Sequence, residues 1–285
     1  MNNIITLKKD KLSAKISTLG AQLLSFCDEK NEYMWQADPN VWGFTAPVVF
    51  PICGRVKDEQ YTFEGKTYTM QQHGFARFKE FEAEKISDDS ACFLLRGDEE
   101  TKKSYPFDFE LRVIFTLGED RLSTTYSVTN PSDKNIYFSF GGHEGYACDN
   151  RADDCYVEFE NDSKITRLML TDGFLNGETK EISLENNKLM VDYKEFEKCN
   201  YLFRDINSDS VIFSTKDDSR RIRIGFEGHN ALAIWTVPER KYLCIEPWCG
   251  IPQSAEFDGD FNEKDSIICL EPKKTFERTH YVQIL

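Results

Sequence analysis

Apolar and polar residues alternate with a period of two over much of the chain, as they do in strands that are buried on one face. The clearest stretch covers residues 107–140, where turn sequences at 118–120 and 130–133 separate three alternating runs. Short turns between alternating runs are typical of neighbouring antiparallel strands. We therefore predict three consecutive antiparallel strands in this stretch.

The same pattern recurs elsewhere and defines the fold class. The sequence YTFEGKTYTM at 61–70 has the form of a short hairpin, and further alternation occurs at 222–234 and at 276–284. Helical spacing is scarce, with one weak candidate at 183–198. No repeat or long linker divides the chain. We predict an all-β fold, one large antiparallel β-sandwich domain over residues 1–285, although the pattern alone does not separate a sandwich from a barrel.

Composition narrows the class of protein. The 22 Phe and 12 Tyr favour a strand-rich globular core. Nine cysteines without regular spacing, and no apolar leader, predict a cytoplasmic protein with reduced thiols. No apolar run is long enough for a membrane span. A net charge of −14 argues against nucleic acid as a partner and leaves a small molecule as the expected one.

Two histidines lie in sequences that favour chemistry. His143 stands in FSFGGHEGYACD, where an alternating run ends at two glycines, so we expect it at a strand end that faces a loop. His73 lies in QQHGFAR, just beyond the hairpin. Either could instead be a hydrogen-bonded structural residue. His229, in the turn EGHN, is expected at the surface, and His280 falls within the C-terminal strand pattern.

A carboxylate follows an apolar run in KYLCIEPWCGIPQ, residues 241–253. Apolar and aromatic neighbours should raise the pKa of Glu246 towards neutrality, where a general base works best. The alternative is an ordinary glutamate at the surface end of a strand. Trp248 and Trp42 could stack on the apolar face of a sugar ring, or could belong to the core.

Other chemistry finds little support in the sequence. No motif has the spacing of a metal site, so we predict no metal and no cofactor. The nucleophile elbow, the phosphate loop and the dinucleotide fingerprint are also absent. Among the reaction types considered, acid–base catalysis remains as the candidate.

Three stretches together resemble one family: residues 47–77, residues 138–146 and YLCIEPWCGIPQ at 242–253. In this order they are similar to the aldose 1-epimerase (galactose mutarotase) family, especially to a shorter bacterial branch named after a lactose-operon protein. The resemblance covers nearly the whole chain. It implies a large antiparallel β-sandwich that binds a sugar on one sheet and interconverts the α and β anomers of an aldose without a cofactor.

The resemblance also implies roles for individual residues. Arg55 resembles an arginine that binds sugar hydroxyls, and His73 resembles the first active-site histidine. His143 resembles the acid that protonates the ring oxygen, and Glu246 resembles the base that takes the proton of the C1 hydroxyl. Opening a pyranose needs such a base and acid together.

Two positions depart from the family pattern. Glu144 stands where the family often has proline, and it could either raise the pKa of His143 or face water. We expect it to face water, because adjacent residues at a strand end point in opposite directions. Cys199 lies near a position where related sequences have an aspartate that binds sugar hydroxyls, and this leaves the substrate open.

The sequence therefore predicts an isomerase of carbohydrate metabolism, a mutarotase acting on a free or phosphorylated hexose. Arg55 and Arg77 leave a sugar phosphate open, since arginine grips phosphate well. Trp248 is a further candidate for substrate binding. The alternative is a non-catalytic carbohydrate-binding protein of the same fold. A glycoside hydrolase or lyase ranks last, because it would need two facing carboxylates or a different base.

Overall fold

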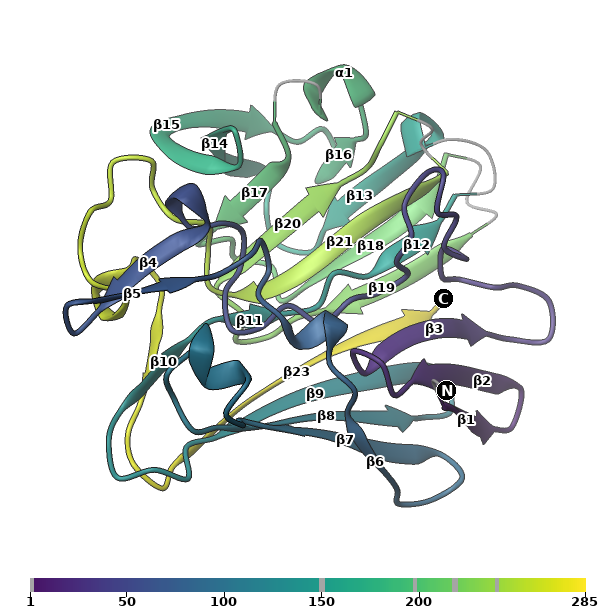
Figure 1. Ribbon diagram of the computed structural model, residues 1–285. Helices are drawn as coiled ribbons and strands as arrows, with labels where there is room; N and C mark the ends of the chain where they lie inside the picture. The colour runs from purple at the N-terminus through teal and green to yellow at the C-terminus, as the bar shows by residue number, and fades with distance from the viewer. Residues whose placement is uncertain (1–2, 149–151, 197–198, 217–219, 239–240) are drawn as a thin grey trace.

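The computed structural model describes residues 3–148, 152–196, 199–216, 220–238 and 241–285. Within these residues the chain forms two large antiparallel sheets (Figure 1), as the alternating pattern predicted. The larger has nine strands in the spatial order β16 (Lys188–Met190), β13 (Cys155–Phe159), β18 (Ser210–Thr215), β19 (Arg221–Gly225), β23 (Thr275–Ile284), β9 (Arg121–Thr129), β8 (Glu110–Leu117), β7 (Ser90–Arg96) and β6 (Glu82–Lys85).

The second large sheet carries the candidate site. Its seven described strands follow the order β11 (Phe140–Gly141), β21 (Tyr242–Cys249), β20 (Ala231–Trp235), β17 (Tyr201–Arg204), β14 (Lys164–Thr171) and β15 (Phe174–Ser183), and β12 (Gly145–Ala147) also pairs with β21. Strand β21 is buried along its whole length. It is therefore the strand on which the surrounding structure fixes side chains most firmly.

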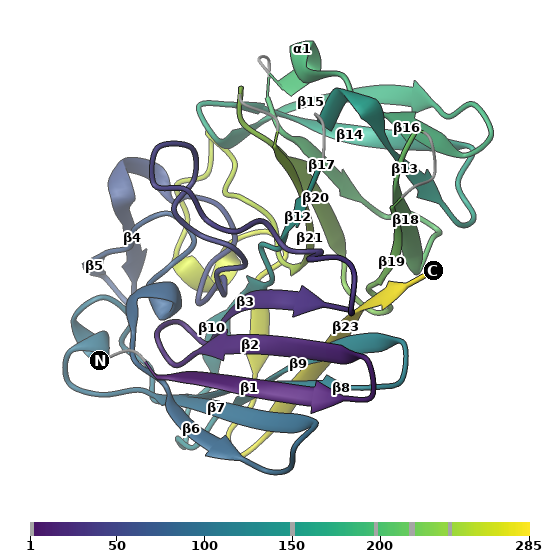
Figure 2. The same ribbon diagram turned by 90° about the vertical axis from the view of Figure 1, so that its right-hand side faces the viewer.

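Smaller elements complete the fold. Strands β1 (Ile4–Lys9), β2 (Leu12–Ser17) and β3 (Gln22–Cys27) form a sheet of their own that lies over β7 and β8 (Figure 2). Two-stranded pairs are made by β4 (Gln60–Phe63) with β5 (Lys66–Thr69) and by β10 (Ile136–Phe138) with β22 (Ile268–Leu270). Helix is limited, in the described residues, to α1 (Tyr193–Phe196) and to 3₁₀ turns at Lys57–Glu59, Ala76–Phe78, Thr101–Lys103, Ala152–Asp154 and Phe261–Glu263.

The main core lies between the two large sheets. Aromatic side chains meet across it, with ring centroids 6.0 Å apart for Phe140 and Phe276 and 5.9 Å apart for Phe159 and Phe203. In each of these pairs one residue belongs to the seven-stranded sheet and the other to the nine-stranded sheet. This is the sandwich arrangement, and it leaves the outer face of the seven-stranded sheet available for a ligand.

Most of the predicted elements are confirmed and two are wrong. The hairpin at 61–70 and the strands at 222–234 and 276–284 are present. In the stretch 107–140, β8 and β9 pair as expected, but the third run leaves them and pairs with β22 and β21 instead. The weak helix at 183–198 reduces to α1, and residues 197–198 lie outside the described part. None of the helices in the described residues is long and apolar enough to cross a membrane.

Candidate active site

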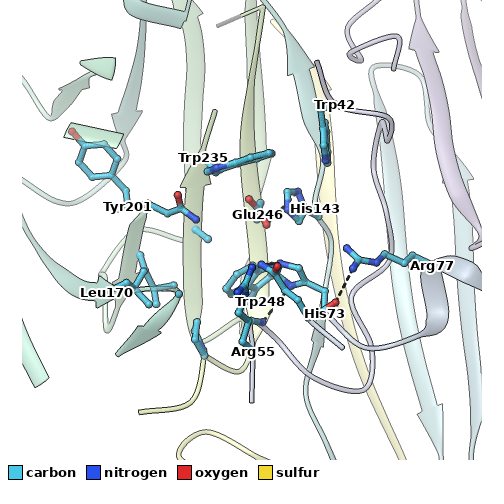
Figure 3. Close-up of a pocket in the computed structure, with 17 residues that line it drawn as sticks. Trp42, Arg55, His73, Arg77, His143, Leu170, Tyr201, Trp235, Glu246 and Trp248 are labelled. Carbon is cyan, nitrogen blue, oxygen red and sulfur yellow. Dashed lines mark hydrogen bonds and ion pairs between the residues drawn. The ribbon is translucent and has the colours of Figure 1, made fainter. Parts of the chain in front are cut away.

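A cavity of about 330 Å³ opens on the outer face of the seven-stranded sheet. Strands β14, β17, β20 and β21 form its floor, and loops before β4 and around residue 73 form its walls. All six predicted site residues line it, as Figure 3 shows: Arg55, His73, Arg77, His143, Glu246 and Trp248. A space of this size is at the lower end of the range for small-molecule sites and suits one sugar ring.

His143 and Glu246 face each other because of the strand register. Gly141 pairs with Trp248 before the gap between β11 and β12, and Gly145 pairs with Cys244 after it, in an unbroken register. His143 therefore stands directly opposite Glu246, and its Nδ1 lies 3.4 Å from Glu246 Oε2. On the other side, Glu246 pairs with Ala233, whose small side chain leaves room above the carboxyl group.

The glycine at 141 is required by the same close packing. A Cβ there would lie 2.4 Å from the Trp248 ring and 2.5 Å from the Pro247 carbonyl oxygen. Both distances are shorter than any ordinary contact, so no other residue fits without displacing β21. This glycine lets β11 approach β21 closely enough to bring His143 over Glu246.

Burial favours the uncharged forms of both groups. It raises the pKa of Glu246 well above its ordinary value, with the nearby Glu144 as a second cause. Burial, with a smaller contribution from the Arg77 cation, lowers the pKa of His143 to about 3. The raised pKa of Glu246 and the lowered pKa of His143 both favour the uncharged form, and the facing atoms Glu246 Oε2 and His143 Nδ1 form no hydrogen bond among the described residues.

His73 stands beside this pair in a fixed tautomer. Its Nδ1 accepts a hydrogen bond of 3.2 Å from the Gly54 amide, and its own amide donates to the Gly54 carbonyl at 2.8 Å. Burial lowers the pKa of His73 well below its ordinary value, and the neighbouring His143 and arginines act in the same direction. Because Nδ1 accepts from a main-chain amide, the neutral ring carries its proton on Nε2, which lies 3.2 Å from the side-chain nitrogen of Gln72.

Aromatic side chains enclose the pair. The ring centroid of His143 lies 5.1 Å from that of Trp42 and 5.6 Å from that of Trp235. Trp248 lies under His73 at 5.6 Å, and its Nε1 donates to the carbonyl of Gly142 at 3.1 Å. Trp42, considered in the sequence as either a stacking or a core residue, thus lines the cavity. Such walls exclude water and offer flat apolar surfaces to a sugar ring.

Arg55 and Arg77 supply positive charge at the cavity. Arg77 donates to the Gln72 carbonyl at 2.8 Å and stacks over Phe78, 4.7 Å from the ring centroid. Arg55 is exposed and passes close to Gly173. Among the described residues, neither guanidinium has a carboxylate within the 4.0 Å of an ion pair, although acidic residues outnumber basic ones in this chain. Both cations are therefore available to an anionic group on a ligand.

The sequence analysis did not predict the wall of the cavity that lies opposite His143. It contains Asn200 and Tyr201, not the neighbouring Cys199. Arg167, wholly buried in β14, holds this wall by donating to the carbonyls of Cys199 and Asn200 and by stacking on the Tyr201 ring. No spacing in the sequence marks these residues, because they reach the cavity only through the pairing of β17 with β20.

Two expectations about polar residues are wrong. Glu144 does point away from His143, but it faces the sandwich interior, not water, and its Oε1 lies 3.0 Å from His280 Nε2. The argument from strand alternation was sound, but it did not anticipate that the opposite face is closed by the other sheet. His229 is half-buried rather than on the surface, with its ring centroid 6.1 Å from that of His280.

One group of potential metal ligands occurs among the described residues. His143, Cys244 and Glu246 each offer one atom, and the three atoms lie within 4.8 Å of one another. Two of the three are the facing acid–base pair, and the buried Cys244 thiol has a pKa well above its ordinary value because of its burial. The sequence-based expectation of no metal and no cofactor stays a prediction.

Comparisons with known proteins agree on one family. A family model for aldose 1-epimerase matches residues 3–281. Protein LacX, encoded on a plasmid of Lactococcus lactis subsp. lactis, is 29% identical over 296 residues, which cover 99% of each chain. A solved structure of a galactose mutarotase related enzyme from Lactobacillus acidophilus is 32% identical with a TM-score of 0.94, covering 99% of this chain and 97% of that one. A galactose mutarotase-like protein from Lactobacillus casei ATCC 334 is 27% identical, also with a TM-score of 0.94, covering 99% of this chain and 100% of that one.

Proposed function

Because this chain belongs to the aldose 1-epimerase family, we propose that it is a cytoplasmic mutarotase that interconverts the α and β anomers of a free or phosphorylated hexose. The observation that carries the proposal is the contact of 3.4 Å between His143 Nδ1 and Glu246 Oε2 at the base of a cavity of sugar size. In a pyranose the C1 hydroxyl and the ring oxygen are bonded to the same carbon. An acid and a base that act on both must lie this close together.

The reaction needs one proton on the His143–Glu246 pair. With that proton on His143, the Glu246 carboxylate takes the proton of the C1 hydroxyl while His143 gives one to the ring oxygen, and the C1–O5 bond breaks. Rotation about C1–C2 presents the other face of the carbonyl, and the reverse transfers close the ring. The proton balance is zero over the cycle, so no cofactor is needed.

The one-proton pair has two forms that the geometry connects. Burial favours the proton on Glu246, because it raises the pKa of that carboxyl group and lowers the pKa of His143. The Nδ1–Oε2 contact is a direct route for its transfer to His143 when a sugar hydroxyl binds the carboxylate. His73 Nε2, which lies 3.2 Å from the Gln72 side-chain nitrogen, donates to a sugar oxygen and holds it in place, a role that the neutral tautomer supports.

Two features bear on the substrate. The unpaired Arg55 and Arg77 guanidiniums favour a sugar with an anionic substituent, and phosphate matches their fork of donors. Asn200 and Tyr201 stand near the position where related sequences have an aspartate, and among the described residues no carboxylate from that wall lines the cavity. We therefore rank a hexose phosphate above the free hexose.

Anomer exchange measured by NMR tests the proposal. Pure α anomers of glucose, galactose and glucose 6-phosphate are followed with wild-type protein and with His143→Gln and Glu246→Gln. Accelerated exchange that both substitutions abolish supports the acid–base pair, and the three rates rank the sugars. Exchange no faster than in buffer, with saturable binding retained, would instead identify a carbohydrate-binding protein of the same fold.

A further inference from the structure

The three potential metal ligands at the base of the cavity occupy three corners of a square on one sheet face. In the register with β21, His143 lies directly opposite Glu246, and Gly145 lies opposite Cys244. Residues two apart on a strand point to the same face. A Cβ on Gly145 would lie 2.8 Å from the ring of Trp42, which lines the cavity, so this corner also faces outward. Because the fourth corner is glycine, no side chain there separates the other three.

The distances between the ligand atoms match those of a metal site. His143 Nδ1 and Glu246 Oε2, which face each other in Figure 3, lie 3.4 Å apart. In a tetrahedral zinc site, bonds of about 2.1 Å to nitrogen and oxygen put these two ligand atoms about 3.4 Å apart. The Cys244 sulfur lies within 4.8 Å of both, against about 3.6 Å in such a site, so it must approach by about 1.2 Å at most.

The facing atoms of the pair need a shared partner. His143 Nδ1 and Glu246 Oε2 are buried, and neither forms a hydrogen bond among the described residues. The three residues are 8%, 0% and 2% exposed for His143, Cys244 and Glu246. Buried polar atoms without partners are costly. A cation bound between these atoms would satisfy both of them.

Cys244 differs from the other cysteine of β21. Cys249 pairs with Phe140 and belongs to the main apolar core, as expected of a cysteine that fills space. Cys244 instead places its sulfur beside an imidazole nitrogen and a carboxylate oxygen. Filling space does not require these polar neighbours. Cys249 is therefore the reference against which a role of Cys244 can be tested.

The chemistry of the three donors favours zinc. Thiolate, imidazole and carboxylate are zinc ligands, whereas magnesium and calcium prefer oxygen alone. When the metal binds, the thiol and the carboxyl group release their protons to solvent. Two anionic ligands and a neutral imidazole balance a divalent cation, so the buried site carries no net charge. The fourth position of the tetrahedron is left for a water molecule or a sugar hydroxyl on the cavity side.

We propose that His143, Cys244 and Glu246 form a zinc site at the base of the cavity, and that bound zinc reversibly switches off anomer exchange. The ion takes the Nδ1 and Oε2 atoms that the reaction needs and lies where the C1 and O5 atoms of the sugar would bind. Zinc and sugar therefore compete. The second half of this inference rests on the proposed function, whereas the first half does not. The site departs from the sequence-based prediction of no metal.

Cobalt binding tests the site without any measurement of activity. Metal-free protein, kept reduced without a thiol reagent, is titrated with Co²⁺ and then with Zn²⁺. We expect a thiolate-to-cobalt charge-transfer band that saturates at one ion per chain and disappears when Zn²⁺, but not Mg²⁺, is added. Cys244→Ala should abolish the band, and Cys249→Ala should retain it, with folding of both variants checked by thermal melts.

The wild-type spectrum alone can overturn the inference, so it does not depend on how the variants fold. Absence of the charge-transfer band would mean that no thiolate binds the metal. A band that survives in Cys244→Ala would also overturn the site and would point to another pair of thiols, such as Cys148 and Cys155, whose sulfur atoms lie 3.7 Å apart.

Anomer exchange of glucose tests the switch. Zn²⁺ should raise KM and leave kcat unchanged in wild type and in Cys249→Ala, and EDTA should restore KM. In Cys244→Ala, the zinc concentration that halves the variant's own metal-free rate should rise by more than about 100-fold, because even an outer-shell contact is worth about 10- to 100-fold in metal affinity. Equal inhibition of all three proteins would indicate adventitious zinc only and would overturn the switch.

The two experiments separate this inference from the proposed function. If the protein does not accelerate anomer exchange but the cobalt band depends on Cys244, the proposed function and the switch fail and the zinc site stands. If exchange is accelerated and no cobalt band forms, the zinc site fails and the proposed function stands.

Discussion

Two histidine–glutamate pairs lie back to back on the segment between β11 and β12, and they differ in access. His143 and Glu246 open into a cavity, and their facing atoms Nδ1 and Oε2 form no hydrogen bond among the described residues. Glu144 and His280 are enclosed between the sheets at 3.0 Å. The same two side-chain types thus occur in an open and in an enclosed setting, and the difference is whether the sheet face is open to a ligand.

The largest expected effect tests the open pair. Glu246→Gln keeps the shape of the carboxyl group but removes its ability to exchange protons, so the rate of anomer exchange should fall by about 10²- to 10⁴-fold. The melting temperature should barely change, because burial raises the pKa of Glu246 and so favours its uncharged form in the folded protein. NMR exchange rates and thermal melts measure the two quantities. A variant that retains most of its activity would remove Glu246 from the chemistry.

The free energy of unfolding should depend more on the enclosed pair than on the open pair. His280→Ala leaves the Glu144 carboxylate buried without its partner, which should cost about 3 kcal/mol of unfolding free energy. His143→Ala leaves a neutral Glu246 beside an open cavity and should cost about 1 kcal/mol. Urea denaturation of both variants gives the comparison. Equal losses of unfolding free energy would mean that the enclosed pair contributes no more to stability than the open pair.

The pH dependence sharpens the account of the open pair. Because the pKa of His143 is lowered to about 3, kcat/KM should fall on the acid side only where His143 takes up a second proton. Because that of Glu246 is raised, kcat/KM should fall on the alkaline side only where the last proton leaves. At a pH two units below the ordinary histidine pKa of about 6.5, kcat/KM should therefore stay near its maximum. A histidine with an unshifted pKa would be about 100-fold depleted in its neutral form at that pH. Stopped-flow polarimetry, with folding checked at each pH, measures this.

The sequence predicted the open pair far better than the enclosed one. His143 and Glu246 stand in distinctive stretches, and both line the cavity. Their alignment, however, depends on the register of β11 and β12 on β21, which no local pattern contains. The orientation of Glu144 was predicted correctly from alternation, but its partner comes from a strand more than a hundred residues later.

The same limit explains the wall of the cavity. Trp235 and Tyr201 occupy ordinary strand positions, and they reach the site because β20 and β17 are neighbours of β21 in the sheet. Alternation predicts which residues share a face of one strand, but it does not predict which strands lie side by side. The fold class was therefore accessible from the pattern, whereas half of the site was not.

A smaller effect is expected at the mouth of the cavity. Arg55→Gln removes one unpaired guanidinium, and a lost bond to a charged group is worth about 1.5–3 kcal/mol. KM for glucose 6-phosphate should rise by about 10- to 100-fold, while KM for glucose changes much less. Arg204→Gln, which removes a half-buried arginine paired with Asp265 outside the cavity, serves as the matched control. Equal changes for both sugars would show that Arg55 does not read an anionic substituent.

The smallest effect should reach both pairs at once. Trp248→Phe removes the 3.1 Å hydrogen bond to the Gly142 carbonyl, a loss of about 1 kcal/mol. Gly142 packs against the Glu144 carboxyl group and precedes His143, so both pairs depend on its position. We expect about a fivefold lower kcat and a parallel change in the His143 and His280 ring signals in NMR spectra. If only the His143 signal moved, the two pairs would be independent neighbours rather than parts of one positioned segment.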